Sequence, residues 1–191
     1  QNAIATPLVS ERDRNFLITN NEEKSILKIS NAKEERGVLE FQTEGLLHLE
    51  QTTKLNLPKP KKNIFGEYLL RNEIGGEDCY VRMVSYLEGT PLDDIRAEII
   101  DPKTLHLSMG KFLAKLGIGL GGFSHPNENH RLLWDVAQTE SLFDLLENIQ
   151  DKQKRKMAEL SLFYFQDNTK GLLSQQRKQV IHNDMNPDNV L

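Results

Sequence analysis

Three polar side chains near the end of the chain have the types and the spacing of a phosphoryl-transfer loop. His182, Asp184 and Asn189 follow the order His-x-Asp-x-x-x-x-Asn. In such a loop the aspartate accepts the proton of an acceptor hydroxyl, and the asparagine holds a divalent metal ion. The apolar residues 180–181 and 190–191 flank the loop and are expected to be strands. A less specific interpretation is an Asx-rich turn between two buried segments.

The same chemistry requires a cation for the phosphate groups of a nucleotide, because catalysis depends on holding the reacting groups in line and neutralising their charge. Lys28 is the one charged residue in the apolar run 26–29, Ile-Leu-Lys-Ile. A strand with alternating faces also places a polar residue at every second position. An exposed strand residue is therefore the alternative interpretation of Lys28.

The elements that must position these residues begin with a β-rich segment. Apolar runs predict strands at 15–19 and 25–30, and apolar residues at helical spacing predict a helix over 33–51. Two further strands are expected at 66–71 and 79–86, joined by a hairpin through the Gly-Gly of residues 74–78. This part of the chain is expected to form a small antiparallel sheet with one helix.

After a break at residues 87–92 the strand signals end and helical periodicity begins. Helices are expected at 102–117, 139–149 and 152–168. The sequence therefore predicts an α+β fold with a sheet lobe at residues 1–86 and a mainly helical, incomplete lobe at 87–191. The chain starts without Met and stops directly after its best motif, so we expect a fragment truncated at both ends.

Several stretches resemble one known family. His-Asn-Asp-Met-Asn-Pro-Asp-Asn-Val-Leu at 182–191 resembles the catalytic loop of the aminoglycoside phosphotransferase and choline kinase superfamily, whose typical members have Gly at the position of Asn183. Ser-Glu-Arg-Asp-Arg-Asn-Phe at 10–16, the segment 81–92 and Leu-Leu-Trp-Asp at 132–135 most resemble its hydroxylysine-kinase branch. That branch includes domains fused to class-III aminotransferases. The resemblance implies a protein-kinase-like, two-lobed fold.

The resemblance implies roles for individual residues. Asp184 is expected to be the catalytic base and Asn189 a ligand of Mg²⁺, with a second metal ligand beyond the end of the chain. Lys28 is expected to bind the phosphates of the co-substrate, ATP or GTP. The Ser85 carbonyl and the Leu87 amide are expected to bond the edge of its base.

Two further positions complete the nucleotide site that the resemblance implies. Lysines at the position of Lys28 pair with an acidic residue on the following helix, and here the corresponding residue is either Gln42 or Glu44. Arg14 lies where the phosphate-covering segment is expected, and it is a candidate for phosphate contact, although a polar turn explains it equally well.

The expected function is that of a small-molecule kinase acting on a hydroxylated amine or amino-acid-like substrate. The resemblance implies fusion to an aminotransferase domain as one organisation of the full-length protein. The fragment alone is expected to be inactive. Gln42 in place of an acid, and a phosphate-covering segment without Gly, favour a second hypothesis, a nucleotide-binding pseudokinase or regulatory domain. An unrelated α+β binding module is the third.

Composition narrows the other classes of function. The net charge of −4 argues against nucleic acid as a partner, and the sequence has no apolar run of about 18 residues that would span a membrane. The single cysteine, Cys79, indicates a reducing compartment, so a cytoplasmic protein is expected, and its apolar surroundings predict a packed thiol. The single tryptophan, Trp134, is expected to pack in a core rather than to contact substrate.

Overall fold

The structure, a computed structural model, describes residues 3–10, 12–21, 23–95, 98, 101–132 and 134–191. The chain forms two compact units, one made of Gln1–Glu128 with Val180–Leu191 and the other of Asn129–Gln179. Glu11 and Leu133, which belong to two of the family-like stretches, lie outside the described residues. The expected lobe boundary between residues 86 and 87 stays a prediction.

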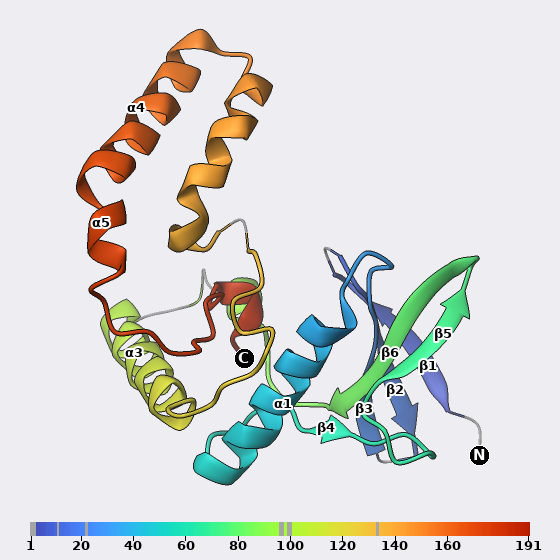
Figure 1. The fold of residues 1–191 in the computed structure, drawn as a ribbon. Helices are drawn as coiled ribbons and strands as arrows, with labels where there is room; N and C mark the ends of the chain where they lie inside the picture. The colour runs from blue at the N-terminus through green and yellow to red at the C-terminus, as the bar shows by residue number, and fades with distance from the viewer. Residues whose placement is uncertain (1–2, 11, 22, 96–97, 99–100, 133) are drawn as a thin grey trace. The chain divides into compact units, whose positions relative to one another are not determined.

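The described residues of the first unit form a six-stranded antiparallel sheet (Figure 1). Its order is β1-β2-β3-β6-β4, and β5 also pairs with β6. The strands are β1 Ile4–Leu8, β2 Arg14–Asn20, β3 Glu23–Ile29, β4 Pro60–Lys61, β5 Leu70–Ile74 and β6 Glu77–Ser85. The expected β5–β6 hairpin is confirmed, and it turns on Gly75 and Gly76, whose φ angles of +67° and +83° favour glycine.

Three strand predictions differ from the structure. Strand β1 was not predicted; it is an edge strand in which all five residues are exposed. The strand predicted from Gly66 begins only at Leu70, since Asn63 Oδ1 accepts the amides of Phe65 and Glu67 and closes a turn there. Residues 180–181 and 190–191 are not strands, so that prediction was wrong.

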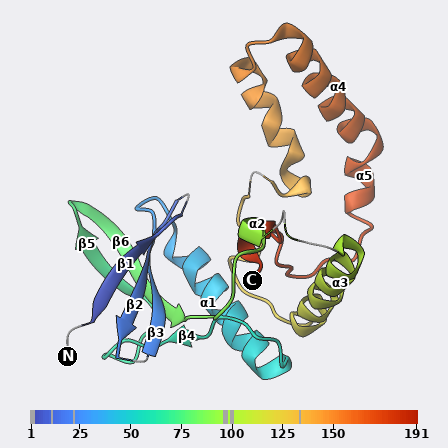
Figure 2. The same cartoon turned by 180° about the vertical axis from the view of Figure 1, so that it is seen from behind.

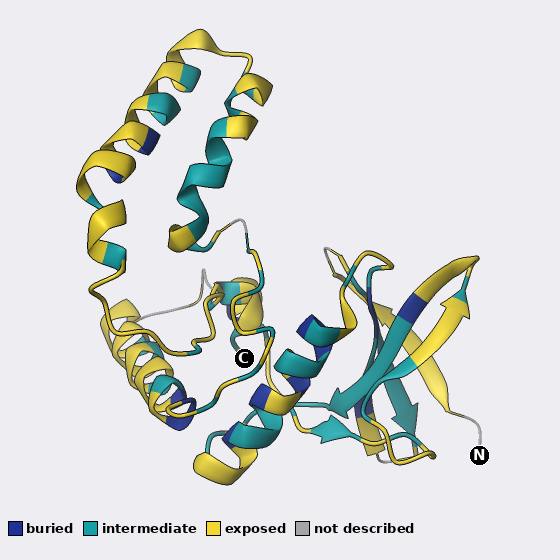
Figure 3. Ribbon diagram, viewed as in Figure 1, coloured by how far each residue is buried: buried dark blue, intermediate teal, exposed yellow. Residues whose placement is uncertain are grey.

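Two helices contribute buried residues to the core of the first unit, together with Ile29 of β3 and Cys79 of β6. Helix α1 Arg36–Thr52 turns one side inward, where Val38, Leu39, Thr43, Gly45 and Leu49 are buried, as the dark blue positions of Figure 3 show. Helix α3 Pro102–Gly119 begins where Asp101 caps the amides of Lys103 and Thr104.

Leu49 of α1 packs with Leu116 and Leu120 to form a cluster. Val180 joins this cluster from the end of the chain, so the segment before the family-like loop is fixed by packing rather than by strand pairing.

The short helix α2 Leu92–Ile95 contacts the turn η3 Pro187–Asn189, and Figure 2 shows the two side by side. The backbone amide of Leu92 donates to the carbonyl of Val190 at 2.8 Å. Gly89 lies so close to Leu191 that a Cβ at this glycine would be 2.8 Å from the Leu191 Cβ. The end of the chain is therefore held against the segment that follows β6.

The second unit contains η2 Val136–Asn148, α4 Lys152–Asn168 and α5 Lys170–Leu173. The bounds predicted for α4 are confirmed, whereas the helix predicted at 139–149 is a 3₁₀ helix. Phe143 of η2 and Phe163 of α4 pack against each other with ring centroids 5.3 Å apart and ring planes tilted by 59°. Trp134 is 54% exposed, so the prediction that it packs in a core was wrong. Among the described residues, no helix is long and apolar enough to cross a membrane.

Candidate active site

Three polar residues form one row across the centre of the sheet. In the strand registers Asn15 of β2 lies opposite Lys28 of β3, and Lys28 lies opposite Arg82 of β6. Residues directly opposite each other in an antiparallel sheet share a face. Lys28 Nζ donates to Asn15 Oδ1 at 3.4 Å. The row therefore puts two cations beside each other in the sheet.

Burial dominates the electrostatics of this row. The pKa of Lys28 is lowered from its ordinary value by burial first and by the charge of Arg82 second, and Asp13 opposes the shift. Burial also lowers the pKa of Arg82, against the opposing effects of Asp13 and Glu34. The Arg82 side chain is 13% exposed, and its Nη2 lies 4.0 Å from Asp13 Oδ2.

The carboxylate whose field acts on Lys28 thus comes from the loop between β1 and β2, not from α1. Gln42 and Glu44 are both exposed, and Glu44 Oε2 lies 3.8 Å from His125 Nε2. Within the described part of the chain, no contact joins either residue to Lys28. A role for Gln42 or Glu44 as its partner stays a prediction.

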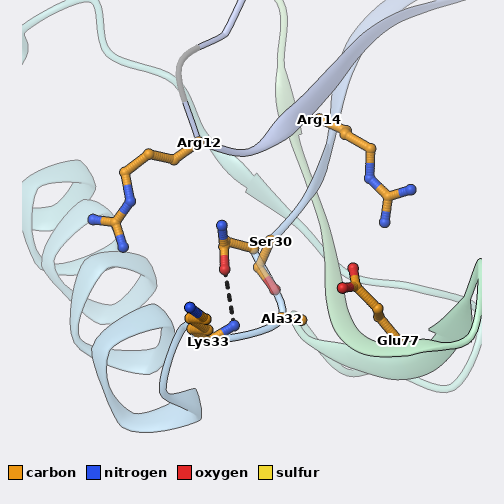
Figure 4. Close-up of a pocket in the computed structure, with 7 residues that line it drawn as sticks. Arg12, Arg14, Ser30, Ala32, Lys33 and Glu77 are labelled. Atoms are coloured by element: carbon orange, nitrogen blue, oxygen red, sulfur yellow. Dashed lines mark hydrogen bonds between the residues drawn. The ribbon is translucent and has the colours of Figure 1, made fainter.

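Arg14 lies on the other face of the sheet from Lys28. It precedes Asn15 by one residue, and successive residues of a strand point to opposite faces. Its Nη2 donates to the Sγ of Cys79 at 3.5 Å, and this thiol is buried as the sequence predicted. Arg14 and Arg12 line a cavity of about 380 Å³ with residues 30–33 and Glu77 (Figure 4). The structure does not bring Arg14 together with Lys28, so its phosphate contact stays a prediction.

The proposed base-binding segment directly follows the row. The Ser85 amide donates to the Lys59 carbonyl at 2.8 Å, and Ser85 Oγ accepts the Lys59 amide at 2.9 Å. These bonds tie the end of β6 to β4. Residues 86–91 form the connector between β6 and α2. Lys24 Nζ of β3 lies 2.8 Å from Glu88 Oε1, and this ion pair joins the sheet to the connector just after Leu87.

The family-like loop is closed by hydrogen bonds among its own residues. The Asp184 amide donates to His182 Nδ1 at 3.3 Å, so His182 supports the loop backbone. The carboxylate of Asp184 accepts at both oxygens, from Asn186 Nδ2 at 3.2 Å and from Asn189 Nδ2 at 2.9 Å. Asn189 Nδ2 also donates to the Asp184 carbonyl at 2.8 Å.

A left-handed residue gives the loop its shape. Asn183 has a φ of +59°, a conformation that costs most side chains energy and that Gly and Asn adopt most readily. This angle explains in physical terms why the chain has Asn where typical members of the family have Gly. It also turns the backbone between His182 and Asp184.

The loop that carries Asn189 is tied to the segment that follows β6. Lys28 and Arg82 are paired across β3 and β6, β6 ends at Ser85, and the following segment is bonded through Leu92 to Val190, next to Asn189. All of these residues belong to the first unit. Sequence reasoning missed Asp13, Asn15 and Arg82. The signal for Arg82 was available, since it is the one charge in the apolar run 81–84.

An antiparallel sheet with helices, a lysine on β3 and an Asp–Asn loop define a protein-kinase-like α+β fold. The chain belongs to the phosphotransferase enzyme family, whose family model matches residues 5–191. No curated protein sequence matches the chain.

Solved structures support the same fold. An amicoumacin kinase solved with AMP-PNP and Ca²⁺ is 14% identical to this chain, with a TM-score of 0.61. The matched region includes 91% of this chain and 49% of the amicoumacin kinase. A spectinomycin phosphotransferase solved with ADP is 12% identical, with a TM-score of 0.56. Here the matched region includes 98% of this chain and 59% of the phosphotransferase. A microcompartment-associated aminopropanol kinase is 18% identical with a TM-score of 0.53, covering 83% and 53%. The chain spans about half the length of these proteins.

Proposed function

We propose that the full-length protein is a small-molecule kinase that transfers the γ-phosphoryl group of ATP or GTP to a hydroxyl of an amine or amino-acid-like substrate. The observation that carries this proposal is the Asp184–Asn189 pair, fixed in one turn beside the connector that follows β6. The family supports the reaction class. The neighbours named for aminopropanol, amicoumacin and spectinomycin support a small-molecule acceptor.

In this proposal Asp184 accepts the proton of the attacking hydroxyl. The amides of Asn186 and Asn189 hold its two carboxylate oxygens, which orients the group before the substrate arrives. Lys28 neutralises phosphate charge. The backbone of Ser85 and Leu87 binds the base, with the identity of the base left open between adenine and guanine.

The residues present fit a Mg²⁺ ion held partly by the nucleotide. Mg²⁺ is usually bound by one or two protein oxygens together with phosphates and water. Asn189 uses its amide nitrogen toward Asp184, so its Oδ1 is the oxygen that a cation would take. The described residues include no cluster of three or more His, Cys, Asp or Glu suited to a metal. The ion would neutralise charge on the transferred group.

One observation favours the second candidate function, a nucleotide-binding pseudokinase or regulatory domain. Lys28 donates to the neutral Asn15, and no carboxylate of α1 contacts it among the described residues. Fusion to an aminotransferase domain and membership of the hydroxylysine-kinase branch stay predictions, because the family match concerns the phosphotransferase domain alone.

The experiment that separates these functions measures nucleotide consumption and binding by the full-length protein. ATP and GTP are each tested with hydroxylated amines, ethanolamine, choline and aminoglycosides, and with deoxy analogues of each active compound. A kinase consumes nucleotide only with a hydroxylated acceptor. Binding of nucleotide without turnover on any acceptor would support the pseudokinase, and absence of both would leave a binding module of another kind.

A further inference from the structure

Two basic side chains on neighbouring strands share one nearby carboxylate. Lys28 and Arg82 are opposite residues of β3 and β6, which places their Cβ atoms about 4.5–5.5 Å apart. Like charges in this position repel each other. Both side chains are largely buried, and solvent and salt screen the repulsion between buried charges least. The two cations nevertheless lie side by side in the sheet.

The charges around the pair do not balance. Lys28, Arg82 and Arg12 are positive, whereas Asp13 and Glu34 are negative, and Glu34 already lies 3.5 Å from Arg12 Nη2. Asp13 therefore serves two cations at once. Among these five described residues one positive charge remains in excess, and a further anion beside them would lower their electrostatic energy.

The contact between Arg82 and Asp13 does not use the N–H donors of the guanidinium in a hydrogen bond. The distance of 4.0 Å between Arg82 Nη2 and Asp13 Oδ2 is that of an ion pair without a hydrogen bond. Asp13 Oδ1 instead accepts the amide of Asn31 at 3.2 Å. A guanidinium carries five N–H donors arranged as a fork that matches phosphate oxygens. Arg82 is the only described member of the row with this geometry.

We propose that Arg82 binds nucleotide phosphate together with Lys28, and that Asp13 is the counterion that these phosphates replace. The inference rests on the proposed function and adds a second phosphate-binding cation to it. Asp13 lies between β1 and β2, within the segment expected to cover the phosphates. When phosphate oxygens bind Lys28 and Arg82, they replace Asp13 as the partner of these two cations. Asp13 then keeps only the hydrogen bond from the Asn31 amide.

A purely structural pair makes a different prediction. If Arg82 and Asp13 only stabilised the fold, replacing either residue would lower the stability of the protein. Nucleotide affinity would then stay unchanged or become weaker in both variants. The proposal requires opposite signs, because Arg82 attracts phosphate and Asp13 competes with it. The two neutralising substitutions therefore separate the two explanations.

The test measures equilibrium binding of ATP, GTP and their nucleosides to the full-length protein. Arg82→Gln is expected to weaken binding of the nucleotide about tenfold or more, as for one lost charged hydrogen-bonding group. Binding of the nucleoside should not change. Asp13→Asn, which keeps an acceptor for the Asn31 amide, is expected to tighten nucleotide binding by about threefold or more.

An exposed ion pair on the same sheet supplies matched controls. Arg71 Nη2 lies 2.6 Å from Asp78 Oδ2, and both side chains are more than 60% exposed. Arg71→Gln and Asp78→Asn make the same chemical changes and are expected to leave affinity within about twofold of wild type.

Each outcome decides the inference. Wild-type affinity in a folded Arg82→Gln variant, or unchanged or weaker binding in Asp13→Asn, would overturn it while the proposed function stands. If Arg82→Gln does not fold, Asp13→Asn decides alone. A wild-type protein that binds neither ATP nor GTP removes the proposed function and the inference together.

Discussion

Asn189 donates its side-chain amide to Asp184 twice, to the carbonyl oxygen at 2.8 Å and to Oδ2 of the carboxylate at 2.9 Å. The proposed base and the proposed metal ligand are thus positioned by contacts within a single short loop. Their relative geometry does not depend on distant packing. This locality explains why their spacing in the sequence is informative.

Replacement of Asn189 tests this link. Asn189→Ala removes both the orientation of Asp184 and the oxygen proposed for Mg²⁺, so we expect turnover to fall and the Mg²⁺ requirement to rise by about 10–100-fold. Initial rates of the full-length protein over a range of Mg²⁺ concentrations measure both. Asn168→Ala on α4, where the amide donates to the Tyr164 carbonyl at 3.0 Å, is the matched control. An unchanged Mg²⁺ profile in Asn189→Ala would remove this residue from the metal site.

The left-handed backbone at Asn183 predicts a specific tolerance. Asn183→Gly should change the free energy of unfolding by less than about 1 kcal/mol and keep activity, whereas Asn183→Val should lose about 1–2 kcal/mol and most activity. Asn21, with a φ of +55° in the β2–β3 turn, is the control position. There Asn21→Val should lower stability by a similar amount without a specific loss of turnover. Full activity in Asn183→Val would show that the loop does not require this conformation.

Two glycines of α3 predict opposite effects of the same substitution. A Cβ at Gly119 would overlap Thr53 Cγ2 and lie 3.0 Å from Leu49 Cδ2, so Gly119→Ala should cost about 1–3 kcal/mol of stability. A Cβ at Gly110 meets nothing within 4 Å, so Gly110→Ala should gain about 0.5–1 kcal/mol of helix propensity. Denaturant unfolding measures both. Equal effects would contradict the packing of α1 on α3.

Burial of Lys28 predicts a conflict between stability and binding. Because its pKa is lowered in the folded state, the protonated side chain destabilises the fold below that pKa. Lys28→Met should therefore raise the melting temperature, by about 2–4 °C for each kcal/mol relieved, while weakening nucleotide binding.

The sign of the pH dependence follows from the same shift. As pH rises through the lowered pKa toward the ordinary value of 10.5, the unfolded state binds more protons than the folded state. The stability of the wild type therefore rises with pH relative to that of Lys28→Met. The difference in melting temperature in favour of the variant becomes smaller. Thermal unfolding of both proteins at neutral and at alkaline pH tests this. A variant whose advantage grows with pH would contradict the cause assigned to the shift.

The sequence carried much of this site in local patterns. The strand position of Lys28 and the Gly-Gly hairpin are local features, and the structure confirms both. The spacing of Asp184 and Asn189 is local as well, but the roles predicted for these two residues and for Lys28 stay predictions. The sheet register is not local, so the pairing of Lys28 with Asn15 and Arg82 could not be read from the chain. The strand prediction at Val180 is wrong because an apolar residue gives the same sequence signal whether its backbone pairs in a sheet or its side chain packs, partly buried, against a cluster.

Turnover by Asp184→Asn in the full-length protein, measured with its best acceptor beside the wild type, tests the central claim most directly. Asparagine keeps the size and an acceptor for the surrounding amides but cannot take a proton from a hydroxyl. We predict that turnover falls by at least about 1000-fold while nucleotide affinity stays within about twofold. Turnover equal to wild type would contradict the assignment of Asp184 as the catalytic base.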